Sequence, residues 1–383
     1  MKERIVITGT GVVSALGCGK QENLAALRAG RSGIAPVRFL RTALQDFPVG
    51  EVPLSNAALA GRLGISRELP RTTLLGILAL QEALVEAGLP GDRGAFPLIS
   101  GTTVGGMDLS EAQFPRFSEF HDCGATTDAM ADHFGCFSFA TTLSTACSSA
   151  ANAIIFGANL IRSGQAERVA AGGSESLSCF HVNGFHSLMI LDTAPCRPFD
   201  ADRAGLNLGE GAGFVILESE EAALRRGARI LAVLGGYGNA CDAFHQTASS
   251  EDGEGAFLAM QEALRRAGIG PEEIDYVNAH GTGTPNNDAS ESAALRRVFG
   301  DRIPPVSSTK AFTGHTTSAS GSIEAVYCIL ALQHGFIPPQ LHFRTPDPAC
   351  ILPCSAAERP LRNVLCNAFG FGGNDSSLLL THA

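Results

Sequence analysis

The chain has 383 residues, of which 45% are hydrophobic and 17% charged, as in an ordinary globular protein rather than a disordered one. Its formal net charge is −10 and it has no long basic run, which argues against nucleic acid as the main partner. Its eleven cysteines are an odd number without a CxxC pair, which favours buried thiols in a reducing compartment and no metal site.

The first half of the chain predicts strands that alternate with helices and are bounded by glycine. Residues 4–8 predict a strand that ends in a turn at residues 9–11, and residues 72–87 predict a helix. Three further strands are predicted at residues 96–100, 168–171 and 214–217. This alternation is typical of an α/β fold with largely buried sheets.

A second cycle of the same kind starts at residue 229. Residues 229–234 predict a strand, 255–267 a helix, 276–279 a strand, and a last helix starts near residue 320. We therefore expect two similar halves, residues 1–228 and 229–383, without a Pro- or Ser-rich linker between them.

Two apolar stretches raise the question of a membrane. Residues 5–16 are broken by threonine and glycine, so a buried first strand is expected there rather than a signal peptide. Residues 137–161 carry no charge but contain many hydroxyl side chains, which makes them a poor membrane span. We expect a cytoplasmic protein with no membrane span.

The motif STACSSA at residues 144–150 precedes an apolar, alanine-rich helix predicted at residues 150–161. It places Cys147 at the N-terminus of that helix, where unpaired N–H groups and the helix dipole favour an anion. Such a position can lower the pKa of a thiol well below its usual value of about 8.5. A cysteine of this kind is more often inert when nothing else points to chemistry.

Two histidine motifs strengthen the case for chemistry at Cys147. His280 follows a predicted strand in NAHGTGT, at the end of the strand where α/β sites gather. His315 closes STKAFTGH in a loop ahead of a helix, five residues after Lys310. Together these residues form a candidate Cys-His-His site.

A glycine-dense turn lies near the C-terminus, in NAFGFGGND at residues 367–375. Backbone N–H groups of such a turn can form an oxyanion hole, and the bulky Phe371 could open or block a channel. A plain β-turn with core phenylalanines is an equally good interpretation of these residues alone.

Six motifs in one order resemble the elongating β-ketoacyl-[acyl carrier protein] synthases of fatty acid and polyketide assembly, members of the thiolase-like superfamily. The match runs nearly end to end. The motifs are VITGTGVVSALG at 6–17, STACSSA at 144–150, RPFDADRAGLNLGEGAG at 197–213, NAHGTGTPNND at 278–288, STKAFTGH at 308–315 and NAFGFGG at 367–373.

The resemblance implies a thiolase fold, in which two pseudo-symmetric halves form a five-layered αβαβα core that assembles as a dimer. It implies that Cys147 takes the acyl group and that the N–H groups of Cys147 and Phe371 hold the oxyanion. His280 and His315 would stabilise the enolate left when a malonyl thioester loses CO₂. Lys310 and Glu324, nine residues after His315, would form a supporting charged pair.

The resemblance also implies an acyl carrier protein as partner, whose phosphopantetheine arm brings the substrate, and no cofactor of the protein's own. Thr282 and Thr284 match positions that bind this arm, and Thr247 is a candidate for a third. Because carrier proteins are acidic, a basic docking patch is expected, and its candidates by position are Arg67, Arg71 and Arg197.

Some stretches depart from the common pattern. The region 107–146 is shorter than in housekeeping members, and the turn ends in Asn374-Asp375 where Thr-Asn is common, which puts the hydrogen bonds there in question. Residues 181–192 and 204–212 look more like synthases of aryl polyene or flexirubin pigment pathways.

The same motifs allow two other interpretations. A non-condensing partner that resembles a chain-length factor would shape the tunnel of a heterodimer, but such partners generally lack the active cysteine. Initiating synthases carry Cys-His-Asn, and degradative thiolases use a second cysteine near the C-terminus. The histidine in TGH at residues 313–315 argues against both of these enzyme classes. We expect a homodimer, with a heterodimer with a chain-length-factor-like homologue as the alternative.

Overall fold

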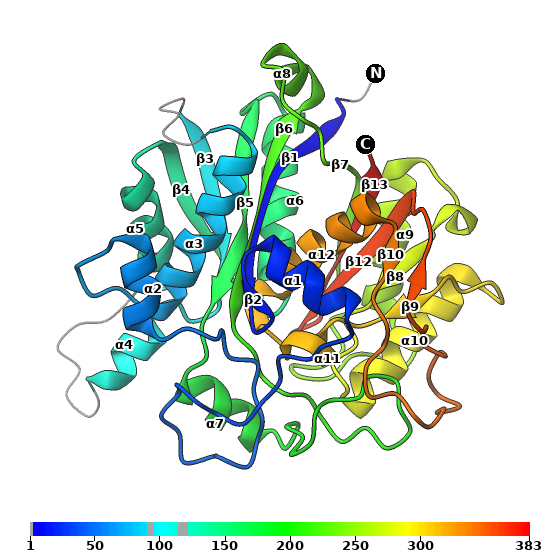
Figure 1. Cartoon of the computed structure of the whole chain (residues 1–383). Coiled ribbons are helices and arrows are strands. Elements are labelled where there is room, and N and C mark those ends of the chain that lie inside the picture. The colour runs from blue at the N-terminus through cyan, green and yellow to red at the C-terminus, as the bar shows by residue number, and fades with distance from the viewer. Residues whose placement is uncertain (1–2, 90–94, 114–121) are drawn as a thin grey trace.

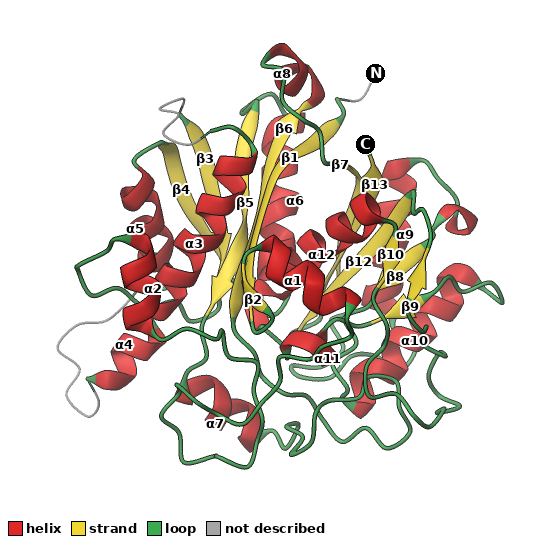
Figure 2. Ribbon diagram, in the orientation of Figure 1, coloured by secondary structure: helices red, strands yellow, loops and turns green. Residues whose placement is uncertain are grey.

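A computed structural model describes residues 3–89, 95–113 and 122–383 (Figures 1 and 2). Its strands in the first half are β1 (Ile5–Ser14), β2 (Gly17–Cys18), β3 (Phe96–Gly101), β4 (Phe137–Leu143), β5 (Arg168–Glu175) and β6 (Gly211–Ser219). Those in the second half are β7 (Ala232–Cys241), β8 (Tyr276–Asn278), β9 (Val306–Ser307), β10 (Phe336–Ile337), β11 (Ala357–Glu358), β12 (Asn363–Gly370) and β13 (Asn374–His382).

The helices connect these strands and cover their faces. In the first half they are α1 (Lys20–Arg28), α2 (Asn56–Leu63), α3 (Arg71–Glu86), α4 (Met107–Ala112), α5 (Ala125–Phe134), α6 (Ser149–Arg162), α7 (Cys179–Ser187) and α8 (Glu220–Arg225). In the second half they are α9 (Glu254–Ala267), α10 (Pro285–Phe299), α11 (Lys310–Thr313) and α12 (Ser320–His334). Two short 3-10 turns, Pro271–Glu273 and Thr317–Ala319, complete the set.

The strand order repeats between the two halves. From the outer edge to the centre, the first half reads β4-β3-β5-β6-β1 and the second β9-β8-β12-β13-β7. When the main strands of each half are numbered along the chain, both orders become 3-2-4-5-1. The halves meet where β1 pairs antiparallel with β7, at Val6 with Val233 and Ile7 with Ala232.

Helices form three layers around these strands. In Figure 1, α3 covers one face of the first half and α9 packs on β7 and β13 of the second. Between the halves lie α6 and α12, which contact each other and strands of both halves. The fully buried faces of α12 explain its nearly uniform apolar sequence, since a helix packed on all sides has no polar stripe.

The predicted turn at residues 9–11 is wrong, because β1 continues through it with a bulge between Ile7 and Gly9. A Cβ at Gly9 or Gly11 would lie 2.2 or 1.9 Å from a carbonyl oxygen of α3. A Cβ at Gly236 or Gly238 of β7 would likewise lie 2.0 or 2.1 Å from a carbonyl oxygen of α9. These glycines therefore mark a close approach of helix to strand, repeated in the two halves.

Other predicted elements are present with small shifts in their ends. The helix predicted at 72–87 is α3, and the helix predicted at 255–267 is α9. The strand predicted at 168–171 extends through the glycine pair to Glu175 as β5. The uncharged stretch 137–161 divides into β4 and α6. None of the helices formed by the described residues is both long and apolar enough to cross a membrane.

Candidate active site

Cys147 lies in a tight loop between β4 and α6, at the C-terminal end of the strand and two residues before the helix. Ala146 has a left-handed backbone (φ 52°), a costly conformation for a residue with a Cβ that the surrounding contacts must hold in place. The Ser149 hydroxyl supplies such contacts, since it accepts from the N–H of Thr145 and donates to the carbonyl of Ala146. The predicted position at a helix entrance is therefore correct.

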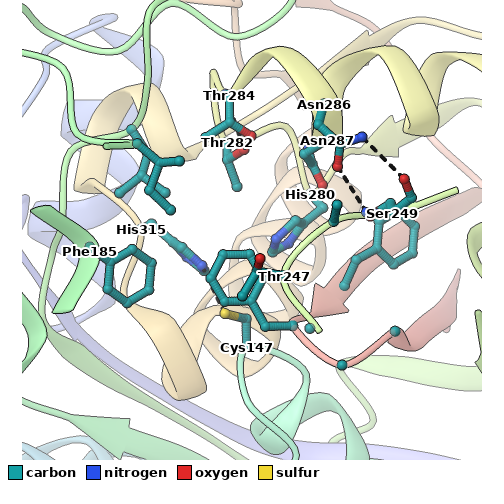
Figure 3. A pocket seen from close by; sticks show the side chains of 18 of the residues that line it. Cys147, Phe185, Thr247, Ser249, His280, Thr282, Thr284, Asn286, Asn287 and His315 are labelled. Carbon is teal, nitrogen blue, oxygen red and sulfur yellow. Dashed lines mark hydrogen bonds between the residues drawn. The ribbon is translucent and has the colours of Figure 1, made fainter. Parts of the chain in front are cut away.

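Both predicted histidines face this cysteine (Figure 3). The Nε2 atom of His315 lies 3.1 Å from the Cys147 sulfur, and its Nδ1 lies 3.0 Å from the hydroxyl of Ser320. The ring of His280 stands edge-on to that of His315, with centroids 5.2 Å apart. Nδ1 of His280 is buried without a hydrogen-bond partner in the part of the chain that the structure describes. The site thus offers two imidazoles beside one sulfur.

The backbone of each histidine is held by hydrogen bonds to another segment of the chain. The N–H of His315 donates to the carbonyl of Asn207, and its carbonyl accepts from the N–H of Gly209, just ahead of β6. The N–H of His280 donates to the carboxylate of Glu291 in α10 at 2.9 Å. These contacts bring residues of both halves to one point.

Burial dominates the titration of all three side chains. It lowers the pKa of His280 and of His315 well below the usual value, and the nearby charge of Lys310 lowers both further. Burial raises the pKa of Cys147 to about 11, although Lys310 and the N–H groups of Phe371 and Cys147 act in the opposite direction. The lowered thiol pKa expected from the helix entrance is therefore wrong, because desolvation of the sulfur outweighs those N–H groups.

The predicted charged pair is present and buried. Nζ of Lys310 lies 2.6 Å from Oε1 of Glu324, and both side chains are almost fully buried. Burial raises the pKa of Glu324 to about 7, against the opposite effect of Lys310. Since the Lys310 charge also acts on Cys147, His280 and His315, the pair sets the electrostatic field of the site.

The glycine-rich turn approaches the same sulfur. The backbone N–H groups of Phe371 and of Cys147 itself lie close enough to the sulfur to lower the pKa of its thiol. The Phe371 ring, 37% exposed, stacks on Phe185 of α7 with centroids 5.9 Å apart. Phe185 also meets the His315 ring edge-on at 6.5 Å. Sequence reasoning missed Phe185, because α7 lies outside the six motifs and also contains a second phenylalanine, Phe180.

A cavity of about 250 Å³ leads to the sulfur. Its lining includes Cys147, His280, His315 and Phe371, together with all three predicted arm-binding threonines, Thr247, Thr282 and Thr284. The hydroxyls of Thr282 and Thr284 lie 2.9 Å apart. Asn286 and Ser249 also line the cavity, and the Asn286 side chain exchanges two hydrogen bonds with the backbone of Ser249, a contact that the sequence did not predict (Figure 3).

The three docking arginines lie in different surroundings. Arg71 is buried and its guanidinium donates to both carboxylate oxygens of Glu210, so its place in a docking patch is wrong. Its helical register turns it inward, toward Glu210, Asn56 and the carbonyl of Leu54. Arg197 is partly exposed and pairs with Asp192 at 3.4 Å, and Arg67 is exposed.

Asn374 and Asp375, which depart from the common pattern of the turn, both contact other residues in the structure. The Asn374 side-chain oxygen accepts hydrogen bonds from three side chains. Asp375 is buried, and burial together with Asp242 and Glu291 raises its pKa to about 8. Part of the shortened region, residues 114–121, lies outside the described residues. Among the residues described, no group of three or more His, Cys, Asp or Glu is arranged to hold a metal ion.

Comparison with known sequences matches both halves of this chain to one family. The profile described as beta-ketoacyl synthase, N-terminal domain, covers residues 2–223, and its C-terminal counterpart covers residues 231–344. Nodulation protein E of Rhizobium meliloti (strain 1021) is 36% identical over 405 residues, 99% of each chain. The 3-oxoacyl-[acyl-carrier-protein] synthase 2 of the same strain is 36% identical over 427 residues, 98% of each chain.

Solved structures give the same result for the fold. The ishigamide ketosynthase/chain length factor superposes with a TM-score of 0.93 at 35% identity, covering all of both chains. The ketosynthase ApeO, solved with its chain length factor ApeC from Xenorhabdus doucetiae, gives 0.86 at 32% identity, covering 100% of this chain and 98% of that one. The fold is the expected thiolase fold, and the chain belongs to the β-ketoacyl synthase family.

Proposed function

We propose that the chain catalyses the decarboxylative condensation of an acyl thioester, carried on Cys147, with malonyl-acyl carrier protein. The observation that carries the proposal is the 3.1 Å contact between His315 Nε2 and the Cys147 sulfur at the end of a cavity. The 36% identity to a 3-oxoacyl-[acyl-carrier-protein] synthase of Rhizobium meliloti supports the reaction class.

In the first half-reaction, the sulfur of Cys147 attacks the acyl carbonyl and its proton passes to Nε2 of His315. The tetrahedral oxyanion accepts from the N–H groups of Cys147 and Phe371, each such donor being worth about 2.7–4 kcal/mol elsewhere. The intermediate collapses by breaking the bond to the carrier sulfur, which takes the proton from His315 and leaves as a thiol. The acyl group then remains on Cys147.

In the second half-reaction, the malonyl thioester loses CO₂ and the electron pair of the broken bond forms an enolate. His280 and His315, neutral because burial lowers their pKa, each donate one N–H to the enolate oxygen. For His315 this step uses the tautomer with the proton on Nε2, in which Nδ1 accepts from the hydroxyl of Ser320. The enolate carbon attacks the acyl carbonyl, and the Cys147 sulfur leaves and takes up a proton from water. The product is a β-ketoacyl thioester two carbons longer.

The partner in this proposal is an acyl carrier protein. Its support is a 27% identical type II PKS ketosynthase, AntDE, solved in complex with the acyl-carrier protein AntF. Because Arg71 is buried, Arg67 and Arg197 remain as the docking candidates. We expect Arg67→Glu and Arg197→Glu to weaken carrier binding and flatten its salt dependence, as for any steering patch. Arg362→Glu, an exposed arginine before β12, is the matched control. Unchanged binding in both variants would reject the patch.

A homodimer formed through β4 is also part of the proposal. β4 is an edge strand of the sheet, and Phe139 on it and Phe156 on α6 are 46% and 38% exposed. An edge strand with exposed aromatic side chains favours pairing with another chain. Sedimentation should show a dimer for the wild type and a monomer for Phe139→Asp/Phe156→Asp. A monomeric wild type would contradict it.

A chain-length-factor-like subunit is the second candidate, because two solved neighbours are described with chain length factors. A non-condensing subunit does not need a nucleophile, two imidazoles and a buried charged pair to converge. That convergence of Cys147, His280, His315 and Lys310 favours the enzyme. The proposal also includes a division into two halves between residues 228 and 229, which the repeated strand order supports. It further includes the aryl polyene branch, a cytoplasmic location and no resident cofactor.

The deciding experiment is intact-mass analysis after incubation with a panel of acyl carrier thioesters. The wild type should gain one acyl group, and Cys147→Ala should gain none. Addition of malonyl carrier should then remove the acyl group from the wild type and release CO₂. Failure of every donor to acylate Cys147, with the protein folded, would overturn the proposed function.

A further inference from the structure

One side-chain oxygen connects the two loops that meet at the Cys147 sulfur. Oδ1 of Asn374 accepts from Nδ2 of Asn152 at 2.7 Å and from Nδ2 of Asn239 at 2.9 Å. It also lies 2.8 Å from the hydroxyl of Ser148, whose single proton it shares with the carbonyl of Thr145 at 2.8 Å. Ser148 directly follows Cys147, Asn152 lies one turn along α6, and Asn239 lies on β7. Asn374 itself is the first residue of β13.

The same residue ends the turn that carries Phe371. Only Gly372 and Gly373 separate Phe371 from Asn374, and both have left-handed backbones, with φ 85° and 78°. Because glycine has no Cβ, these two residues allow the turn several backbone conformations, and contacts with other residues must select one of them. The turn is tied on its outer side, where the N–H of Gly372 donates to Gln246 and the carbonyl of Gly373 accepts from Asp242. Asn374 supplies the side-chain tie on the side of Cys147.

Further hydrogen bonds hold in place the side chains that contact Asn374. The hydroxyl of Ser376, on the same face of β13, donates to Oδ1 of Asn152 at 2.8 Å. Nδ2 of Asn239 lies 2.9 Å from the hydroxyl of Ser376 and 3.0 Å from Oδ1 of Asn152, so its two hydrogens are shared among these two oxygens and that of Asn374. Side chains locked by such a network hold their geometry to within a fraction of an ångström. The start of α6, β7 and β13 therefore share one polar junction.

We infer that Asn374 is a positioning residue, which holds the N–H of Phe371 and the N–H of Cys147 at the separation that an oxyanion requires. The inference rests on the proposed function, because it concerns the acylation step. The threonine common at this position elsewhere in the family carries its oxygen one bond nearer the backbone, so it would not reach Ser148 and Asn152 from the same place. In this chain the longer amide spans that gap.

The expected signature is a loss of rate without a loss of binding. The arm-binding threonines, Thr247, Thr282 and Thr284, line the cavity from loops outside the junction that Asn374 forms. Misplacement of a reacting group by about 1 Å can cost about 100-fold in rate. We therefore expect Asn374→Ala to lower the maximal rate of Cys147 acylation by about 100-fold, with the half-saturating donor concentration unchanged within about twofold.

Single-turnover acylation by an octanoyl carrier thioester, followed by intact mass, tests this. Asn363→Ala is the matched control, since Asn363 is a buried amide at the other end of the same hairpin, where its side chain bonds Thr381 and Glu273. Its thermal stability should fall as much as that of Asn374→Ala, with acylation unchanged. Equal acylation losses in the two variants, or a loss below about threefold in Asn374→Ala, would overturn the inference.

Two further measurements separate positioning from folding and from the proposed function. Ser148→Ala/Asn374→Ala should acylate no more slowly than Asn374→Ala alone, because both changes remove one junction. Alkylation of Cys147 by iodoacetamide forms no oxyanion, so it should change less than about threefold in Asn374→Ala. Additive losses, or alkylation slowed as much as acylation, would overturn the inference. Should Asn374→Ala fail to fold, Asn374→Thr serves in its place. A wild type that is acylated by no donor of the carrier thioester panel refutes the proposed function instead.

Discussion

The Nε2 atom of His315 lies 3.1 Å from the sulfur of Cys147, across 168 residues of sequence. Burial raises the pKa of the thiol to about 11 and lowers the pKa of the imidazole well below its usual value. The resting pair is therefore a neutral thiol beside a neutral imidazole. The sulfur becomes a nucleophile when its proton moves to His315 during the attack, as in other Cys–His pairs.

This geometry predicts different defects for the two histidines. His280→Ala should lose decarboxylation but retain acylation of Cys147, because its ring lies beside His315 and not on the sulfur. His315→Ala should lose both, with acylation slowed by about 10²–10⁴-fold, the usual contribution of a general base. Release of ¹⁴CO₂ from malonyl carrier and intact-mass acylation measure the two steps separately. His334→Ala, in the last turn of α12, serves as control, and equal acylation by both active-site variants would contradict the division.

Alkylation of Cys147 should depend steeply on pH. Below a pKa of about 11 the thiolate fraction rises about tenfold for each pH unit, so the iodoacetamide rate should increase through pH 7 to 10 without a plateau. A cysteine in an unstructured peptide with blocked ends, whose thiol pKa is about 8.5, should level off within the same range. Peptide mapping of Cys147 after timed labelling gives the rates. A plateau below pH 8 would instead indicate a preformed thiolate–imidazolium pair.

Removing one partner of the buried pair Lys310 and Glu324 should destabilise the fold strongly, whereas replacing both partners with apolar residues should destabilise it much less. Lys310→Ala and Glu324→Ala each leave one charged or polar partner buried, which costs about 3–5 kcal/mol in the free energy of unfolding. Lys310→Met/Glu324→Leu removes both groups and should recover most of that loss. The exposed pair Arg225 and Glu167 provides the comparison, with a loss of about 1 kcal/mol or less for Arg225→Ala. Urea denaturation measures all four, and single variants no worse than this control would refute the prediction.

Asp375 should make the protein less stable as pH rises. Its folded pKa of about 8 lies above the unfolded value of 3.8, so its contribution is fully favourable below about pH 4 and is lost between pH 4 and 8. Asp375→Asn cannot ionise, and its stability relative to the wild type should therefore grow over that interval. At about 1.36 kcal/mol per pKa unit, a shift from 3.8 to about 8 limits the difference to about 6 kcal/mol.

Urea denaturation at pH 5, 7 and 9 checks this dependence on Asp375. Asp301→Asn, a change at an exposed loop carboxylate, should follow the wild type at every pH. A constant difference between Asp375→Asn and the wild type across the three pH values would show that the carboxyl does not titrate in the expected range.

Much of the site could be expected from the sequence, because its parts occupy short motifs. Cys147 and His280 each lie where a glycine- or serine-rich loop joins a strand to a helix, and His315 lies in the short loop between α11 and the 3-10 turn before α12. Lys310 and Glu324 lie five residues before and nine residues after His315. The resemblance to a known family then indicated which of these loops meet, and the structure brings all of them to one cavity.

Other features depended on contacts that no local pattern contains. The glycines at residues 9–11 have the composition of a turn, yet they accommodate α3 at a distance only packing can set. Arg71 has the charge of a docking residue, but the orientation of α3 turns it onto Glu210. Phe185 lies outside the six motifs, and the sequence marked Asn374 only as a departure from the common turn. The contacts of both residues depend on the ring or loop that faces them.

The amino-acid sequence by itself determined the family, the α/β alternation and the identity of the reactive side chains, since these depend on residue type and on spacing along the chain. The tertiary structure decided the protonation of the site and the geometry of its loops. Desolvation, which raises the pKa of Cys147 and lowers that of His315, is a property of the space around a group. That space is filled by residues from both halves, so the free energy of each charge depends on the folded molecule.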